Sequence, residues 1–207
     1  LGLRSPTVAA QEWGGWVWIN LSGPDSAPPL LEWLGPDIVS DLGRFRMEEM
    51  IVLDKLVYDI PVNYKAVVDG FNEVYHVTEL HHVPPEFTKS ARDTTFHLTG
   101  PNSMMFVPRA DRREPLEESG DHHRFAICHY VVFPNSVFNN NPDQIQLFQP
   151  IPLAVDRTRF ICWELIYGPS DADAGDADDA GDYERYLENT KRRWAELQAV
   201  VEEDIFV

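Results

Sequence analysis

The residues of this chain whose types and spacing best suit chemistry are Glu73, His76 and His81, which fall within nine consecutive positions. Two imidazoles and a nearby carboxylate are what an oxygen-activating iron(II) ion needs, provided that one more carboxylate arrives from elsewhere. On an ideal helix, a spacing of five residues turns two side chains about 140° apart. If both histidines bind one metal, we therefore expect the helix to end or unwind between them.

A helix over residues 63–75 is predicted to lead into this group. Its apolar residues recur at intervals of three and four, which places them on one face, and Asn63 is a suitable N-cap. The apolar set is Tyr64, Val67, Val68, Phe71 and Tyr75. Gly70 falls mid-helix, where glycine costs about 1 kcal/mol relative to alanine, so we expect either close packing or room for a ligand there. Val77-Thr78 and the proline pair at 84 and 85 favour an end to the helical segment between the two histidines.

A second helix, predicted over residues 183–206, offers the missing carboxylate. Its apolar stripe consists of Leu187, Trp194, Leu197, Val201 and Ile205. Asp204 follows Val201 by three positions and Leu197 by seven, so it points toward the buried side. A carboxylate there is costly unless it is paired or bound to a metal. Asp204 is therefore the candidate third ligand, and its neighbour Glu203 is the alternative.

The other histidines are weaker candidates. His82 is adjacent to His81 and is a rival ligand by register. His122 and His123 lie in an acidic, turn-rich stretch, where we expect exposed side chains without a site role. His97 is a strand residue with no visible partner. His129 alternates with apolar strand residues, which favours a hydrogen-bonded core histidine but leaves pocket lining open.

The region after the histidines is rich in short strands separated by turn signals. Candidate strands span residues 94–98, 103–107, 124–133, 144–148 and 158–167, and earlier ones span 15–21 and 46–60. Residues 30–42 are predicted to form one or two short helices. This order indicates an α+β fold, an antiparallel sheet with helices packed on one face. The low-complexity acidic composition of residues 171–182 predicts a solvated, mobile loop. A calcium loop is the alternative, but the run lacks the pattern of an EF-hand loop.

Composition excludes several classes of function. With 207 residues the chain can form one large domain, and its net charge of −17 argues against a nucleic-acid partner. No apolar run approaches the roughly 20 residues of a membrane helix, and no signal peptide is visible. The cysteines Cys128 and Cys162 form no CxxC motif, which makes a disulfide framework or a cysteine-bound cluster unfavourable. A cytoplasmic, reducing setting is predicted.

Residues 63–81 resemble the signature of Rieske-type non-haem iron oxygenase α subunits, the aromatic-ring-hydroxylating dioxygenases. The family shows Asn-Trp-Lys, an acidic-Asn-Phe run, and then an acid, two residues, His, four residues and His. Softer resemblance occurs at residues 15–20, 133–135 and 203–204, so the chain is similar to the C-terminal catalytic domain over nearly its whole length. Two departures are Tyr64, where the family has Trp, and Gly70, where it has Asn. The second puts the local polar contacts near the iron in doubt.

The resemblance implies a role for each residue of the group. His76, His81 and Asp204 match the ligands of a mononuclear Fe(II), and Glu73 matches the acid that bridges one subunit's iron to the neighbour's Rieske cluster. It also implies a helix-grip-like catalytic domain over residues 1–207. The family's [2Fe–2S] cluster needs Cys-x-His and Cys-x-x-His, and this chain has neither. We therefore expect the cluster domain to precede Leu1. The periodic segment that stops at Val207 likewise predicts that the chain is part of a longer protein.

The resemblance implies an oxygenase that uses O2 to hydroxylate an organic, most typically aromatic, substrate. Electrons would come from NAD(P)H through a reductase, a ferredoxin and the Rieske cluster, in a homotrimer or an α3β3 assembly. One alternative is a monooxygenase or demethylase of a methyl ether or a quaternary amine, with Trp163, Tyr130 and Tyr167 available for an aromatic cage. Another is a metal-free module that encloses an apolar ligand, for which His76 and His81 would be dispensable.

Overall fold

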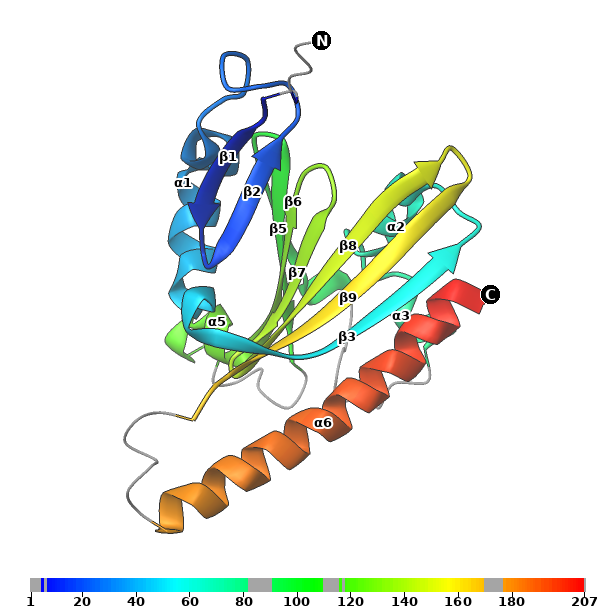
Figure 1. Cartoon of the computed structure of the whole chain (residues 1–207). Helices are drawn as coiled ribbons and strands as arrows, with labels where there is room; N and C mark the ends of the chain where they lie inside the picture. Colours follow the sequence, from blue (N-terminus) through cyan, green and yellow to red (C-terminus); the bar gives the residue numbers. More distant parts are fainter. Residues whose placement is uncertain are drawn as a thin grey trace.

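An antiparallel sheet, with strands of five to eleven residues, organises the molecule (Figure 1). The computed structural model describes residues 5, 7–81, 91–109, 116, 118–169 and 177–206. Within these residues, seven strands pair in the order β3-β9-β8-β7-β6-β5-β4, every neighbour antiparallel. The strands are β3 (Met50–Ile60), β4 (Thr95–Thr99), β5 (Asn102–Pro108), β6 (Ala126–Val132), β7 (Ser136–Asn141), β8 (Gln144–Ala154) and β9 (Arg157–Tyr167). The predicted α+β class with an antiparallel sheet is confirmed.

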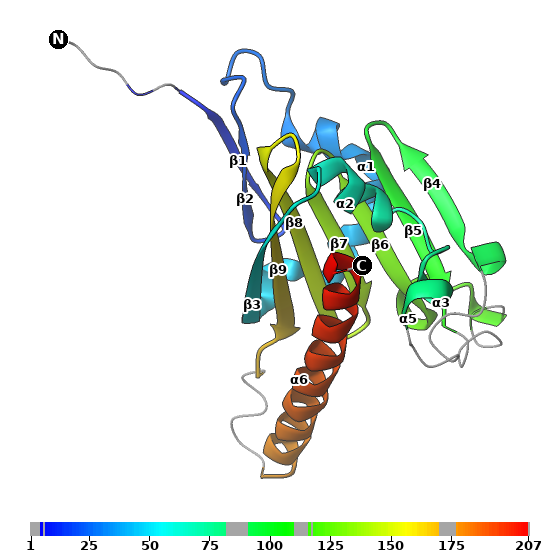
Figure 2. The ribbon, with the colours of Figure 1, turned by 90° about the vertical axis from the view of Figure 1, so that its right-hand side faces the viewer.

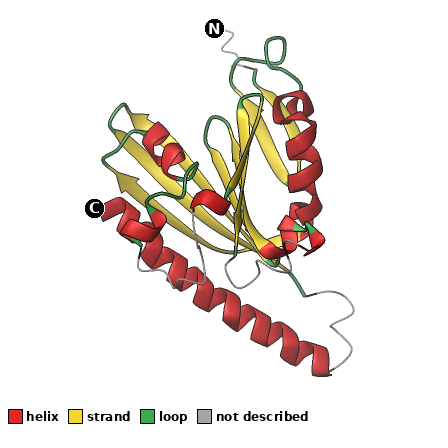
Figure 3. Cartoon of the chain, turned by 180° about the vertical axis from the view of Figure 1, so that it is seen from behind, coloured by secondary structure: helices red, strands yellow, loops and turns green. Residues whose placement is uncertain are grey.

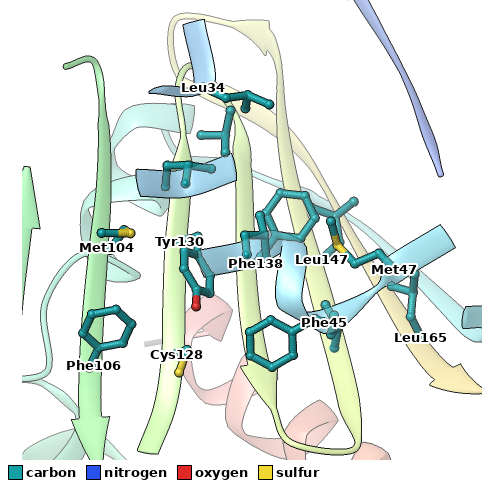
Figure 4. Close-up of a cluster of buried hydrophobic side chains, with 14 of the residues drawn as sticks. Leu34, Phe45, Met47, Met104, Phe106, Cys128, Tyr130, Phe138, Leu147 and Leu165 are labelled. Atoms are coloured by element: carbon teal, nitrogen blue, oxygen red, sulfur yellow. The ribbon is translucent and has the colours of Figure 1, made fainter. Parts of the chain in front are cut away.

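One face of the sheet is covered by helix α1 (Leu30–Leu42) and by a separate hairpin, β1 (Ala9–Trp13) with β2 (Trp16–Asn20). Two short 3-10 turns, η1 (Gly43–Phe45) and η2 (Met47–Glu49), lead from α1 into β3. The side chains between these elements form the larger apolar core, which Figure 4 shows around Leu34, Phe45 and Tyr130. Helix α1 therefore forms a helical layer on this face of the sheet. The sequence predicted helices on one face only, and the helices that carry the candidate ligands lie on the other face.

The β1–β2 hairpin turns at Gly14 and Gly15, whose φ angles are +62° and +77°. Two consecutive left-handed residues are what a two-residue hairpin loop requires, and glycine adopts them without steric cost. A Cβ on Gly15 would also lie 2.9 Å from the Cα of Glu48. The turn thus seats the hairpin and its three tryptophans against the core beside η2.

The opposite face carries the helices that bear the candidate ligands. These are α2 (Tyr64–Gly70), α3 (Val77–Leu80) and α6 (Ala177–Phe206), and Figures 2 and 3 show α6 running across this face with its C-terminal end near α3. A second apolar cluster fills the space beneath them. In it the ring of Phe71 stacks on Phe148 at 4.5 Å, and Trp194 and Val201 of α6 are buried. Trp194 also donates its Nε1–H to Asp54 Oδ2 at 2.8 Å.

Several element boundaries differ from the sequence prediction. Asn63 caps α2 as expected, because its side chain accepts a hydrogen bond from the Lys65 backbone N–H at 3.0 Å, but the helix ends at Gly70 rather than residue 75. Helix α6 begins at Ala177, so the end of the acidic run is helical, while residues 170–176 lie outside the described part. Strands β1 and β7 and the short helices η3 (Ala91–Asp93) and α5 (His122–Phe125) were not predicted.

Strand β8 continues past the predicted end at residue 148, through Pro150 and Pro152 to Ala154. Its pairing with β7 stops at Phe148, whereas its pairing with β9 continues. Prolines lack an N–H, and they are tolerated where one side of a strand is unpaired. In the described part of the chain, no helix is both long and apolar enough to cross a membrane.

Candidate metal centre and substrate pocket

His76 and His81 lie at the two ends of the four-residue helix α3. His76 is its N-cap, and His81 is its C-cap with an extended backbone, φ −88° and ψ 134°. The expected end between the histidines does not occur, because residues 77–80 are helical; the helical segment is instead interrupted before His76 and ends at His81. The two rings come together at 5.3 Å between centroids.

Asp204 reaches the same point from the last turn of α6. Its Oδ1 lies 3.1 Å from His81 Nε2 and 3.8 Å from His76 Nε2. One atom of each residue falls within 4.8 Å of the others, although the residues come from opposite ends of the described chain. The structure thus brings together the three residues predicted to bind a metal.

The other ring nitrogen of each histidine contacts a second carboxylate. His76 Nδ1 contacts Glu73 Oε1, and Glu73 Oε2 also accepts from the backbone N–H of His76 at 3.3 Å. His81 Nδ1 lies 2.9 Å from Glu203 Oε2. A carboxylate on the far nitrogen fixes the tautomer and direction of a metal-binding imidazole. Glu203 occupies this orienting position, a role that sequence reasoning missed when it treated Glu203 as a rival of Asp204.

Burial affects the charge state of the group. Burial raises the pKa of the Asp204 carboxyl, and the neighbouring His81 and His76 oppose that rise. The His81 side chain is only 3% exposed, and those of His76 and Asp204 are 29% and 31% exposed. Two imidazole nitrogens and one carboxylate oxygen with space on one side match the donor set of a non-haem iron(II) centre. The residues present therefore fit the metal.

A cavity of about 260 Å³ adjoins the group, between the sheet and the helices that cover it. Its lining includes the three candidate ligands, apolar side chains such as Phe148 and Val201, and several amides of the sheet. Gly70 lines it as well, and a Cβ added there would meet nothing within 4 Å. Of the two reasons expected for this glycine, room for a ligand is the one the structure supports.

The remaining histidines divide between this cavity and other places. His129 lines the cavity, its Nδ1 makes no hydrogen bond to any described residue, and burial lowers its pKa to about 4. Pocket lining, rather than a hydrogen-bonded core role, is thus its position. His97 on β4 lies 5.9 Å from the Phe106 ring. His82, the rival ligand, lies outside the described residues.

The prediction that His122 and His123 are exposed was wrong for His123, which is buried, and neither residue is isolated. Asp41 Oδ1 lies 3.2 Å from His122 Nε2 and 2.8 Å from His123 Nε2. Tyr130 donates its hydroxyl to Asp41 Oδ2 at 2.6 Å. The acidic, turn-rich sequence suggested solvent, but α5 folds these residues onto the end of α1. They form a second two-histidine, one-aspartate cluster, on the α1 side of the sheet and away from the cavity.

The three aromatic residues available for a cation cage do not line the cavity. Tyr130 and Trp163 pack with the core on the α1 side, and Tyr167 donates its hydroxyl to the Phe45 carbonyl at 2.6 Å. Strand alternation places all three on the face opposite the candidate ligands. A cage built from them is therefore not available to a ligand in the cavity.

Comparisons with solved structures find the same fold. The quaternary ammonium Rieske monooxygenase CntA in complex with an inhibitor superposes with a TM-score of 0.65 at 15% identity, over 90% of this chain and 48% of that one. Naphthalene 1,2-dioxygenase from Rhodococcus sp., bound to indole, gives 0.58 at 18% identity, over 78% and 45%. The chain spans about half the length of these structures. No curated protein matches it.

The family comparison concerns the sequence itself. The family described as "Ring hydroxylating alpha subunit (catalytic domain)" matches residues 47–207, a span that includes the whole of the sheet and all the candidate ligands. Its members are oxidoreductases, non-haem iron oxygenases whose full-length relatives carry a Rieske cluster. The chain belongs to this family of ring-hydroxylating α subunits, as a Rieske oxygenase catalytic domain.

Proposed function

We propose that His76, His81 and Asp204 hold one iron(II) ion, and that this domain hydroxylates an organic substrate placed in the adjoining cavity. The observation that carries the proposal is the direction of the two imidazoles. Both Nε2 atoms face Asp204 Oδ1, while both Nδ1 atoms are held by carboxylates. When bound, the iron supplies the activation of O2, chemistry that no side chain can perform.

The chain's own residues would orient the metal-binding imidazoles, enclose the substrate and exclude bulk water. Glu73 and Glu203 keep the two imidazoles turned toward the ion, as outer-sphere carboxylates do in other metal sites. The apolar side chains of the lining, which include Phe148 and Val201, shield the site from bulk water. The space beside Gly70 admits the substrate next to the ligands.

The electron supply would come from outside the described residues. We infer a Rieske [2Fe–2S] cluster in the full-length protein, reduced by NAD(P)H through a reductase or ferredoxin, with residues 1–207 acting as one catalytic domain in the cytoplasm. A solved relative, a quaternary ammonium Rieske monooxygenase at 14% identity and a TM-score of 0.63, is described as giving insights into carnitine oxidation and inter-subunit electron transfer. Glu73 contacts His76 and its side chain is 31% exposed, which suits a bridge to a neighbouring subunit in a homotrimer or α3β3 assembly. Sedimentation of the full-length protein as a monomer would contradict this bridge.

The substrate class is proposed to be a small aromatic compound, since the cavity between the sheet and α6 has a volume of about 260 Å³ and apolar side chains such as Phe148 in its lining. Removal of a methyl group from an ether or a quaternary amine is the second candidate, because the solved relatives include a quaternary ammonium monooxygenase as well as a naphthalene dioxygenase. The position of Trp163, Tyr130 and Tyr167 on the far face weighs against the quaternary amine. A metal-free module that encloses an apolar ligand is the remaining alternative.

Metal analysis separates the oxygenase from the metal-free module. Protein purified without exposure to oxygen and loaded with iron(II) is expected to retain close to one equivalent. The double variant His76→Ala/His81→Ala should lose it while keeping its circular dichroism spectrum. Retention of less than about half an equivalent by well-folded wild-type protein would reject the iron proposal, since a formed site binds its metal stoichiometrically.

A further inference from the structure

Four polar side chains form a row across the sheet beneath the cavity, and three of them, His129, Asn139 and Gln146, line it. His129 of β6 is directly opposite Asn139 of β7, Asn139 is opposite Gln146 of β8, and Gln146 is opposite Glu164 of β9. Glu164 alternates with Cys162 and Phe160, which places it on the same face as the cavity. A polar row this deep is unusual, because Gln146 is 2% exposed and Glu164 0%.

Hydrogen bonds give the row a direction. Gln146 donates Nε2–H to Glu164 Oε2 at 2.8 Å, and Asn139 donates Nδ2–H to Gln146 Oε1 at 2.9 Å. Protonation of Glu164 on its other oxygen would leave Oε2 an acceptor, so the direction does not depend on the charge of this residue. Each amide therefore turns its N–H toward Glu164 and its carbonyl oxygen away from it.

The consequence is an unused acceptor at the other end of the row. Asn139 Oδ1 is buried and accepts no hydrogen bond from any residue that the structure describes, and the same is true of Gln144 Oε1 two positions before Gln146. Both residues line the cavity. His129 Nδ1, also unpartnered there, can donate or accept according to its tautomer. Buried polar atoms of native proteins normally have partners, and a ligand or water that brings donors would supply them here.

We propose that the row is the polar end of the substrate site and selects a flat ligand that carries an N–H or O–H donor, bound to Asn139 Oδ1. A plain hydrocarbon would leave this acceptor without a partner. A carboxylate would bring only acceptors to it, and a quaternary ammonium has no N–H to donate. Oxidation of the ligand rests on the proposed function, whereas the selection of a donor does not require iron.

The row also sets the orientation of the ligand. The acceptor belongs to the sheet, whereas two candidate metal ligands flank α3 and the third belongs to α6, both of which cover the sheet. A ligand anchored by its donor on β7 would direct the remainder of its ring toward the covering helices. The donor-bearing edge is therefore held away from oxidation, and the opposite edge is presented.

Indole and indene test the proposal, because they share a shape and differ in one ring N–H. Their dissociation constants would be measured on full-length protein in the presence of a chelator, so that the result is independent of iron. Wild-type protein is expected to bind indole on the order of 10-fold more tightly, the effect of one buried hydrogen bond to an otherwise unpaired acceptor. Equal affinities would overturn the proposal, as would tighter binding of indene-2-carboxylate than of indole.

Substitutions in β7 test whether Asn139 causes the preference for indole over indene. Asn139→Leu should abolish the preference for indole, and Asn139→Asp, which keeps an acceptor, should retain it. Asn140→Leu is the matched control. Asn140 is the next residue of the same strand, is buried on the other face of the sheet, and pairs with Cys128 of β6. An unchanged preference in Asn139→Leu would overturn the assignment, and if that variant does not fold, loss of the preference in folded Asn139→Asp would do so. Iron-binding protein without the preference would reject this inference alone, and a preference in protein that binds no iron would reject the proposed function alone.

Discussion

At the scale of single residues, the candidate metal centre consists of two carboxylate–imidazole pairs and one further carboxylate. Glu73 with His76, and Glu203 with His81, each form a carboxylate–imidazole pair, and Asp204 lies where the two pairs converge. The sequence predicted the three meeting residues from their types and from a family resemblance. It could not distinguish the tasks of Glu203 and Asp204, because neighbours on a helix differ in direction by about 100° and only the position of α6 decides which one faces the cavity.

Glu164 carries a prediction about pH. Burial raises its pKa to about 8, from an ordinary value of 4.5, so between these values the folded protein holds a proton that the unfolded chain releases. The folded state then binds more protons, and the free energy of unfolding falls as the pH rises through this interval. Glu164→Gln removes this dependence. We expect urea denaturation across the interval to give a flatter profile for Glu164→Gln than for the wild type.

The exposed Glu188→Gln of α6 serves as the control and should keep the wild-type slope. Parallel pH profiles for wild type and Glu164→Gln would show that Glu164 ionises normally, and the row beneath the cavity would then carry a charge at neutral pH.

At the scale of elements, the break between α2 and α3 supplies part of the pocket lining. The apolar stripe that predicted a helix to residue 75 is physically real, since Phe71 does pack on Phe148. It packs there from a turn, however, because the chain leaves the helix at Gly70 and begins a new one after His76. Periodicity records which residues are buried, and a turn can bury the next residue of a stripe as well as a helix can.

A size series at Gly70 tests the role of this break. Gly70→Ala and Gly70→Leu should fold, since an added Cβ meets no atom within 4 Å and the residue has an ordinary φ angle. Replacement of a helical glycine by alanine should change the free energy of unfolding by about 1 kcal/mol or less, in the stabilising direction. Affinity for a two-ring ligand should fall progressively from glycine through alanine to leucine, as measured by titration.

The stability measurement separates two causes of weaker binding, a cavity filled by the new side chain and a destabilised fold. Loss of affinity in a leucine variant that unfolds as the wild type does would support a filled cavity. Undiminished affinity in folded Gly70→Leu would mean that ligands do not enter beside α2.

Other elements were missed for identifiable reasons. Residues 136–141 contain three consecutive asparagines, a composition typical of a loop, yet β7 forms there because β6 and β8 pair with it on both sides. The prolines of β8 suggested an end to that strand, and only the absence of β7 beside them in the sheet shows why they are tolerated. Tertiary pairing decided both cases, and a single sequence does not contain that pairing.

At the scale of the whole molecule, the sheet separates two sides with different tasks. The α1 side holds the larger apolar core and the Asp41 cluster, and the α6 side holds the cavity and the candidate ligands. Strand alternation predicted that such faces exist but not which face would receive each helix. For this reason the prediction placed helices on one face and left Trp163 and Tyr130 available to a ligand. His123 was expected to be exposed for a different reason, the acidic and turn-rich sequence around it.

The two clusters of one aspartate and two histidines allow the most direct test of the account. Asp204→Ala and Asp41→Ala remove the same side chain from sites of the same composition on opposite sides of the sheet. Iron(II) binding would be measured under anaerobic conditions by titration, with circular dichroism as the check on folding. The account predicts that Asp204→Ala loses the bound iron, whereas Asp41→Ala keeps close to one equivalent and loses thermal stability, because Tyr130 and His123 lose their buried partner. Unchanged iron binding in Asp204→Ala, or its loss in folded Asp41→Ala, would contradict the assignment of the metal centre.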